Sequence, residues 1–144
     1  MLKKSFRTIA MLIMASTVFS CKTTEKAHQK EVKPFVGTWN DADNPINKIV
    51  FNADGRFYNI NTENGLQVVT HSGTFKILSD STYTLNITDA RPNAMYDLKG
   101  RHYANHYALS SDKKTMKING VVDGRNGVAP LAWSTNLVKV DKLD

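Results

Sequence analysis

His102 and His106 come closest to a metal-binding pattern in this sequence. On a helix, a separation of four residues would place both imidazoles on one face, where a zinc ion could bind them. The local pattern is that of a strand, however, and four residues of strand span about 13 Å. Because zinc lies about 2 Å from its ligands, one ion cannot reach both rings. We therefore predict two surface histidines, no metal site and no cofactor.

Residue patterns that support catalysis are missing or incomplete. The run Asp41-Ala42-Asp43-Asn44 begins like a calcium loop, but Ile46 and Asn52 stand where that loop needs its Gly and its Glu. The sequence contains no Gly-x-Ser-x-Gly motif, and its only cysteine, Cys21, lies near the N-terminus. We therefore predict that the protein is not an enzyme. A hydrolase would need an acid and a base that meet only in the folded barrel.

A mixed aromatic and polar face suits ligand binding better than catalysis. Tyr103, Asn105 and Tyr107 alternate along a predicted strand, so they share one face, and Arg101 precedes them. Ligand pockets are mostly apolar with a few placed polar groups, which this face provides. With Trp133 from the last predicted strand, these residues form the predicted ligand-binding set. The alternative is an ordinary packed wall.

The first 21 residues have the features of an exported lipoprotein. A head with three basic residues precedes an apolar run, residues 9–19, and Ser20 and Cys21 follow this run. The run is shorter than the roughly 20 residues that span a bilayer, so we predict a signal peptide over residues 1–20. Cys21 would then be lipidated and anchor the protein to a membrane. The alternative is a free or dimer-forming thiol.

The rest of the chain divides into a tether and one domain. Residues 22–33 carry only two apolar side chains, which predicts a flexible tether after the lipidated cysteine or, alternatively, a short helix. Residues 34–144 have the length of a single domain. The formal net charge of +6 lies mostly outside it, because the domain has 12 basic and 11 acidic residues. That balance excludes a nucleic-acid partner, which would need a clustered basic face.

The domain alternates between apolar and polar residues almost throughout. Tyr83, Leu85 and Ile87 alternate with polar residues, as expected of a half-buried strand. Turn signals such as Asn52-Ala53-Asp54-Gly55 separate such runs, and Gly73 predicts a bulge within one of them. We predict an all-β, antiparallel, up-and-down barrel of eight or nine strands. Two irregular stretches interrupt it, residues 88–101 and 122–130.

The segment Phe35-Val36-Gly37-Thr38-Trp39 resembles the first strand of lipocalins. This resemblance implies a lipocalin-like barrel in which Gly37 and Trp39 are structural and the tryptophan plugs the closed end. The usual late arginine that packs on this tryptophan is replaced by Lys139 or Lys142. The ordered runs at 49–57, 73–77 and 79–83 are similar to small lipocalin-like lipoproteins of Gram-negative anaerobes, whose domain has no assigned function.

These features together predict an envelope lipoprotein whose barrel binds a small, partly apolar or glycan-like ligand. Lys22 follows the cysteine, which favours the outer membrane of a Gram-negative bacterium in enterobacterial-type sorting. The alternative is a filled barrel that contacts another envelope protein through a rim loop such as residues 90–100. An open cavity would favour the first hypothesis, and an exposed apolar patch without a cavity would favour the second.

Overall fold

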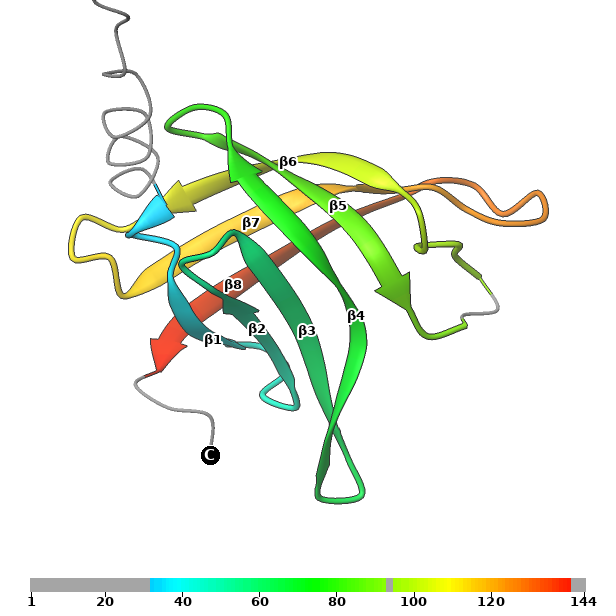
Figure 1. The fold of residues 1–144 in the computed structure, drawn as a ribbon, viewed down its shortest axis with the longest axis horizontal. Helices are drawn as coiled ribbons and strands as arrows, with labels where there is room; N and C mark the ends of the chain where they lie inside the picture. The colour runs from blue at the N-terminus through cyan, green and yellow to red at the C-terminus, as the bar shows by residue number, and fades with distance from the viewer. Residues whose placement is uncertain (1–31, 93–94, 141–144) are drawn as a thin grey trace, which may run out of the picture.

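The computed structural model describes residues 32–92 and 95–140. They form eight strands that pair antiparallel with their sequence neighbours, and the last strand closes the barrel on the first (Figure 1). The strands are β1 (Gly37–Asp41), β2 (Asn47–Phe51), β3 (Arg56–Glu63), β4 (Leu66–Ile77), β5 (Thr82–Ala90), β6 (His102–Leu109), β7 (Thr115–Val122) and β8 (Leu131–Val140). The predicted all-β, up-and-down, lipocalin-like barrel is therefore confirmed. The described part of the chain holds no helix long and apolar enough to cross a membrane.

Alternation in the sequence becomes alternation between the inside and the outside of the barrel. In β7, Met116 and Ile118 are buried while Thr115 and Lys117 are exposed. In β6, Asn105 is buried while His102 and His106 are exposed, as the strand pattern predicts. The strands form here because each buries one row of side chains and leaves the other row to water.

The turns and bulges follow local chemistry. Asn64 and Gly65 both have positive φ, 52° and 78°, as a two-residue hairpin between β3 and β4 requires. The predicted irregularity at Gly73 is confirmed, because the β4–β5 register shifts between Ser72 and Gly73. Pairing then resumes, so β5 continues to Ala90 and the predicted loop at 88–101 begins three residues too early.

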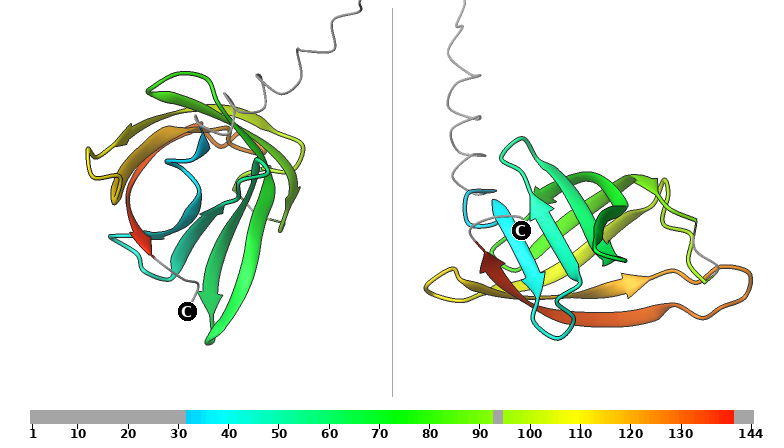
Figure 2. Two further views of the ribbon diagram at one scale, coloured as in Figure 1. Left: turned by 60° about the vertical axis from the view of Figure 1, so that its left-hand side comes forward. Right: turned by 90° about the horizontal axis from the view of Figure 1, so that it is seen from below.

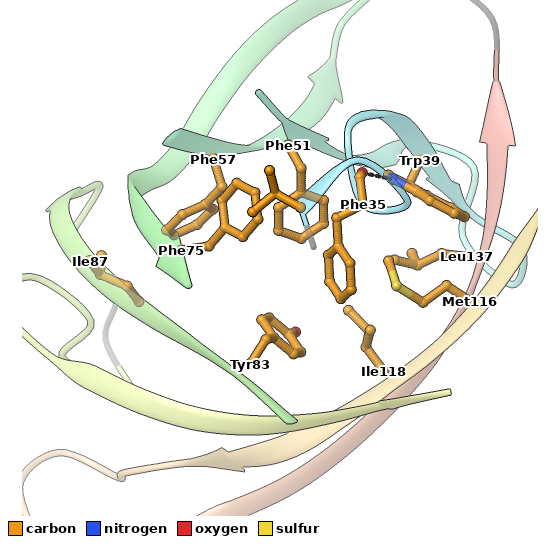
Figure 3. Close-up of a cluster of buried hydrophobic side chains, with 11 residues drawn as sticks. Phe35, Trp39, Phe51, Phe57, Phe75, Tyr83, Ile87, Met116, Ile118 and Leu137 are labelled. Atoms are coloured by element: carbon orange, nitrogen blue, oxygen red, sulfur yellow. Dashed lines mark hydrogen bonds between the residues drawn. The ribbon is translucent and has the colours of Figure 1, made fainter. Parts of the chain in front are cut away.

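The segment before β1 closes one end of the barrel. In the left view of Figure 2 it lies inside the ring of strands. Phe35 lies amid the buried core in Figure 3, with ring centroids 5.4 Å from Phe51 and 5.6 Å from Tyr83. Val32 is only 1% exposed and packs in the same core. Val32 thus belongs to the barrel rather than to the predicted tether, so the domain begins before residue 34.

Trp39 and Lys139 complete the closed end. The indole Nε1 of Trp39 donates a hydrogen bond to the Phe35 carbonyl at 2.8 Å (Figure 3). The ammonium of Lys139 lies 5.1 Å from the centre of the indole ring, within the range of a cation–π contact. Its aliphatic part runs past Gly37, where a Cβ would lie 2.7 Å from Lys139 Cε. Lys139 therefore occupies the place that the resemblance reserves for a late arginine, and burial lowers its pKa.

The opposite end of the barrel carries the two longest connections, residues 91–101 and 123–130. Figure 1 shows the second of these, in orange, at the end opposite the β6–β7 turn in yellow. The two connections touch: Tyr96 bridges Gly124, and the Arg125 amide donates to the Met95 carbonyl at 2.9 Å. The eight strands and the core of the described part of the chain lie within residues 32–140, so this part has what it needs to fold on its own.

Candidate functional site

The barrel encloses a cavity of about 720 Å³ that opens at the end with the long connections. Its floor consists of core side chains, among them Phe51, Tyr83, Ile118 and Leu137. Pro92, Tyr96 and Leu98 of the first long connection line it near the mouth. A volume of this size lies within the range of small-molecule sites, roughly 300–1,000 Å³.

Three of the five predicted ligand-binding residues line this cavity. They are Tyr103 and Asn105 from β6 and Trp133 from β8. The structure therefore brings together two of the three residues on the predicted β6 face and joins them to the predicted aromatic of the last strand.

Tyr107 belongs to the closed end instead. Its ring packs edge-on against Phe35, with centroids 4.6 Å apart, and its hydroxyl donates to the Ser79 carbonyl at 2.9 Å. Tyr107 shares a strand face with Asn105, but it lies two residues nearer to the β6–β7 turn. The core fills the barrel at that level, so Tyr107 is part of the packing rather than of the cavity wall.

Arg101 does not line the cavity either. It is exposed at the start of the barrel wall, and its Nε donates to the Asp97 carbonyl at 3.3 Å. Its own carbonyl accepts a hydrogen bond from the Ile87 amide at 2.9 Å. Arg101 therefore stabilises the connection before β6 and does not present its charge to the cavity.

Asn105 lies in a row of residues that crosses four strands at one level. Tyr83 of β5 pairs with Asn105, and Gly120 of β7 pairs with Trp133 of β8. A Cβ on Gly120 would collide with Oδ1 of Asn105 and would lie 3.1 Å from the Trp133 ring. The absent side chain at position 120 thus leaves the space in which the Asn105 amide and the Trp133 indole lie side by side.

Several polar atoms of the cavity wall lack a hydrogen-bond partner among the described residues. These buried atoms without a partner are the amide oxygen and nitrogen of Asn105 and the hydroxyl groups of Tyr103 and Thr135. Burial raises the pKa of Tyr83, and Asn105 lies close enough to lower it, which opposes part of that rise. No hydrogen bond of good geometry joins the two, however. The Asn105 amide therefore presents an unused donor and an unused acceptor.

The two tyrosine hydroxyls near this row stay protonated. Burial is the largest cause that raises the pKa of Tyr103, and the backbone of Asp123 opposes this rise without a hydrogen bond of good geometry. Burial raises the pKa of Tyr83 as well. Both side chains are neutral near neutral pH, so they add polarity to the cavity without adding charge.

His71 is a cavity residue that the sequence analysis did not single out. Burial lowers its pKa to about 4, so the imidazole is neutral near neutral pH. Its Nδ1 lies 3.2 Å from the Thr70 hydroxyl, and its ring packs edge-on against Phe57. Thr70 and His71 both line the cavity although they are adjacent, because the β3–β4 register shifts at Asn59 and leaves Thr70 as an extra residue. Strict alternation could not reveal this pair.

Ionised side chains line only the mouth. Arg91 donates from Nη1 to both carboxylate oxygens of Glu63, at 2.8 and 3.0 Å, and both side chains are about half exposed. Asp41 lies at the end of β1 on the same rim. The described cavity wall is thus aromatic and apolar at the floor, polar but uncharged at mid-depth, and ionised at the mouth.

Metal binding has no support among residues 32–92 and 95–140, because they contain no group of three or more His, Cys, Asp or Glu side chains that could hold an ion. His102 and His106 point away from the barrel interior and are exposed. Cys21, the predicted lipidation site, lies outside the described residues.

The comparison with known proteins gives a family but no function. No curated protein matches this chain. A family match covers residues 21–137, which include β1 to β7, most of β8 and every cavity residue named above. The chain therefore belongs to the family described as Domain of unknown function (DUF4488).

Proposed function

We propose that this chain is a binding protein of the bacterial cell envelope. Its barrel takes up a small ligand that is partly apolar or glycan-like, and a lipid on Cys21 holds the protein at the outer membrane of a Gram-negative cell. The proposal includes no catalysis, because the wall at mid-depth carries uncharged polar groups and aromatic rings, and the carboxylates lie at the mouth, where Glu63 is paired with Arg91.

One observation carries the binding proposal: the cavity is large and open although the closed end is densely packed. An eight-stranded barrel is just wide enough for its side chains to fill it or for one small ligand. Here the fully buried aromatic side chains form the core of the closed end and the cavity floor, and about 720 Å³ remain toward the mouth. A barrel that served only as a rigid surface would gain stability from larger side chains in that space.

Native mass spectrometry tests the binding proposal. Residues 22–144 contain the whole barrel, and they can be exported to the periplasm of a Gram-negative host and purified without detergent. We expect an additional mass that disappears on denaturation. In a matched variant, Asn59→Trp and Thr135→Trp insert two indole rings into the cavity, and this variant should lose the additional mass while it stays folded. A bare chain mass, also after incubation with envelope extract, would contradict ligand binding.

The second candidate function is protein contact through the rim. Met95, Val121, Val128 and Leu131 all lie near the open end and are between 40% and 52% exposed. Such a group of apolar side chains is a candidate contact surface. In this case a partner captured from envelope extract would be lost with Val128→Ser and retained with the double tryptophan variant. If the barrel binds a ligand, the additional mass should instead survive Val128→Ser and be lost in the double tryptophan variant.

The anchor is tested separately from the barrel. The full chain and its Cys21→Ala variant are expressed in a Gram-negative host that is fed an alkyne-labelled fatty acid. We expect label and outer-membrane fractionation for the unchanged chain and neither for the variant. An equally labelled variant would contradict lipidation at Cys21, and an unlabelled parent chain would contradict lipidation altogether.

A further inference from the structure

The side chain of Asn105 is the most unusual polar group in the barrel. It is 1% exposed, and neither its amide oxygen nor its amide nitrogen has a hydrogen-bond partner among the described residues. An unsatisfied buried polar group lowers stability, so most buried polar groups in proteins are paired. Asn105 also lines the cavity, so a ligand that displaces the side chains covering its amide would reach both atoms.

The neighbours of Asn105 hold its amide in place. Gly120 leaves the space for Oδ1, which any side chain at that position would displace. Tyr83 lies beside it on β5, and Trp133 lies across Gly120 on β8. The amide is thus fixed between two aromatic side chains at the depth where the apolar floor gives way to polar groups.

The surroundings of Asn105 select an uncharged partner. The ionised side chains of the cavity lie at the mouth, where Arg91 is already paired with Glu63. His71, the titratable imidazole of the wall, is neutral near neutral pH because burial lowers its pKa. A carboxylate or ammonium at the depth of Asn105 would lose its hydration without gaining an opposite charge, which is strongly unfavourable.

We propose that Asn105 binds an uncharged carboxamide or lactam group of the ligand through two hydrogen bonds. Its Oδ1 accepts from the N–H of that group, and its Nδ2 donates to the carbonyl. An aromatic or other flat apolar part of the ligand then packs against the rings near the floor. This inference rests on the proposed function, because it assumes that the cavity takes up a ligand.

Three probes of nearly the same shape test the inference: naphthalene-2-carboxamide, its methyl ester analogue and naphthalene-2-carboxylate. The ester lacks the donor, and the carboxylate carries a charge. Dissociation constants are measured by NMR titration of residues 22–144, and the side-chain amide resonances of Asn105 are followed. We expect the carboxamide to bind about tenfold more tightly than either analogue, since one or two hydrogen bonds of ordinary strength give such a factor.

Two variants connect that preference to Asn105. Asn105→Leu keeps the size of the side chain and removes both polar atoms, so it should bind carboxamide and ester equally. Asn136→Leu makes the same change on an exposed position of β8 and should keep the tenfold preference.

The possible outcomes separate the inference from the proposed function. Equal binding of all three probes to the unchanged barrel, or a preference that survives Asn105→Leu, overturns the inference and leaves ligand binding intact. A copurified ligand without an amide or lactam group overturns it as well. If no probe binds and native mass spectrometry finds only the bare chain, the proposed function fails together with the inference.

Discussion

In the proposed function, Asn105 lowers the stability of the unliganded barrel and contributes to ligand binding. A leucine at position 105 would make the unliganded barrel more stable, because the neighbouring side chains are mostly apolar or aromatic and no described group pairs with the amide. Residues that lower the stability of the unliganded protein are typical of binding sites, where the ligand supplies the missing partner. The small residue Gly120 beside Asn105 supports this interpretation. The space that its missing side chain leaves is occupied by the Asn105 amide and the Trp133 indole.

Asn105→Leu should therefore stabilise the unliganded protein. Removing an unsatisfied buried amide is expected to raise the free energy of unfolding by about 1–3 kcal/mol. Chemical denaturation of residues 22–144 measures the change, and Asn136→Leu on the outer face should stay within about 0.5 kcal/mol of the parent. A loss of stability in Asn105→Leu would show that the amide has a partner in the free protein.

His71 should make the stability depend on pH. Its pKa is lowered by burial to about 4 in the folded protein, against 6.5 for the ordinary side chain. Between these values the unfolded chain binds a proton that the folded chain does not, so the free energy of unfolding falls as the pH falls from about 6.5 to about 4. The expected loss is up to about 3 kcal/mol.

Comparison with two variants isolates this contribution from that of the carboxylates. His71→Gln should flatten the pH dependence within the same window, whereas His102→Gln, on the exposed face of β6, should leave it unchanged. If the parent and His71→Gln follow parallel curves, His71 is protonated in the folded protein in the same way as in the unfolded chain.

At the scale of the elements, the sequence predicts well which residues form strands. It predicts poorly whether an inward side chain lies in the packed end of the barrel or beside the cavity. Alternation identifies the inward side chains, because each strand has one buried and one exposed face. It does not say whether an inward side chain fills the core or lines a cavity. Asn105 and Tyr107 share a face, yet only Asn105 lines the cavity. The difference depends on the stagger of neighbouring strands and on the segment around Phe35 that fills one end, which are properties of the closed barrel.

The bulges limit sequence-based prediction in a second way. Thr70 and His71 both line the cavity because the β3–β4 register shifts beside them, so alternation assigns one of them to the wrong face. Thr135 could have been found, since it lies between Trp133 and Leu137 on the same face of β8. The predicted bulge at Gly73 was recognisable because a glycine within a strand commonly marks one.

Gly73 should tolerate substitution much less than the turn glycine Gly65. A Cβ on Gly73 would collide with the backbone carbonyl of Asn86 on β5, which cannot move without breaking the barrel ladder. A Cβ on Gly65 would meet nothing within 4 Å, although φ is +78° there. We expect Gly65→Ala to cost about 1 kcal/mol. Gly73→Ala should cost several times more or prevent folding, and equal costs in thermal or chemical unfolding would contradict a tight β4–β5 contact.

The whole molecule divides into a packed end and an open end. The core around Phe35, Phe51 and Met116 supports the turns of the closed end, and Lys139 covers Trp39 there. The other halves of the long strands surround the cavity and carry the connections that meet at Tyr96 and Gly124. A ligand bound as proposed would therefore change the open half without disturbing the part of the barrel that keeps it folded.

Hydrogen exchange should reveal this asymmetry along a single strand. In β8, amides near Leu137 lie beside the packed core, whereas amides near Trp133 lie beside the cavity. Exchange through local opening is slower where more apolar contacts must break, so we expect slower exchange at the Leu137 end of the unliganded strand. A ligand in the cavity reaches Leu137 only at the floor but contacts the wall at Trp133 and Thr135, so it should slow exchange mainly at the Trp133 end. Equal protection along β8 in the free protein would mean that the barrel opens as one unit, and a ligand would then protect both ends alike.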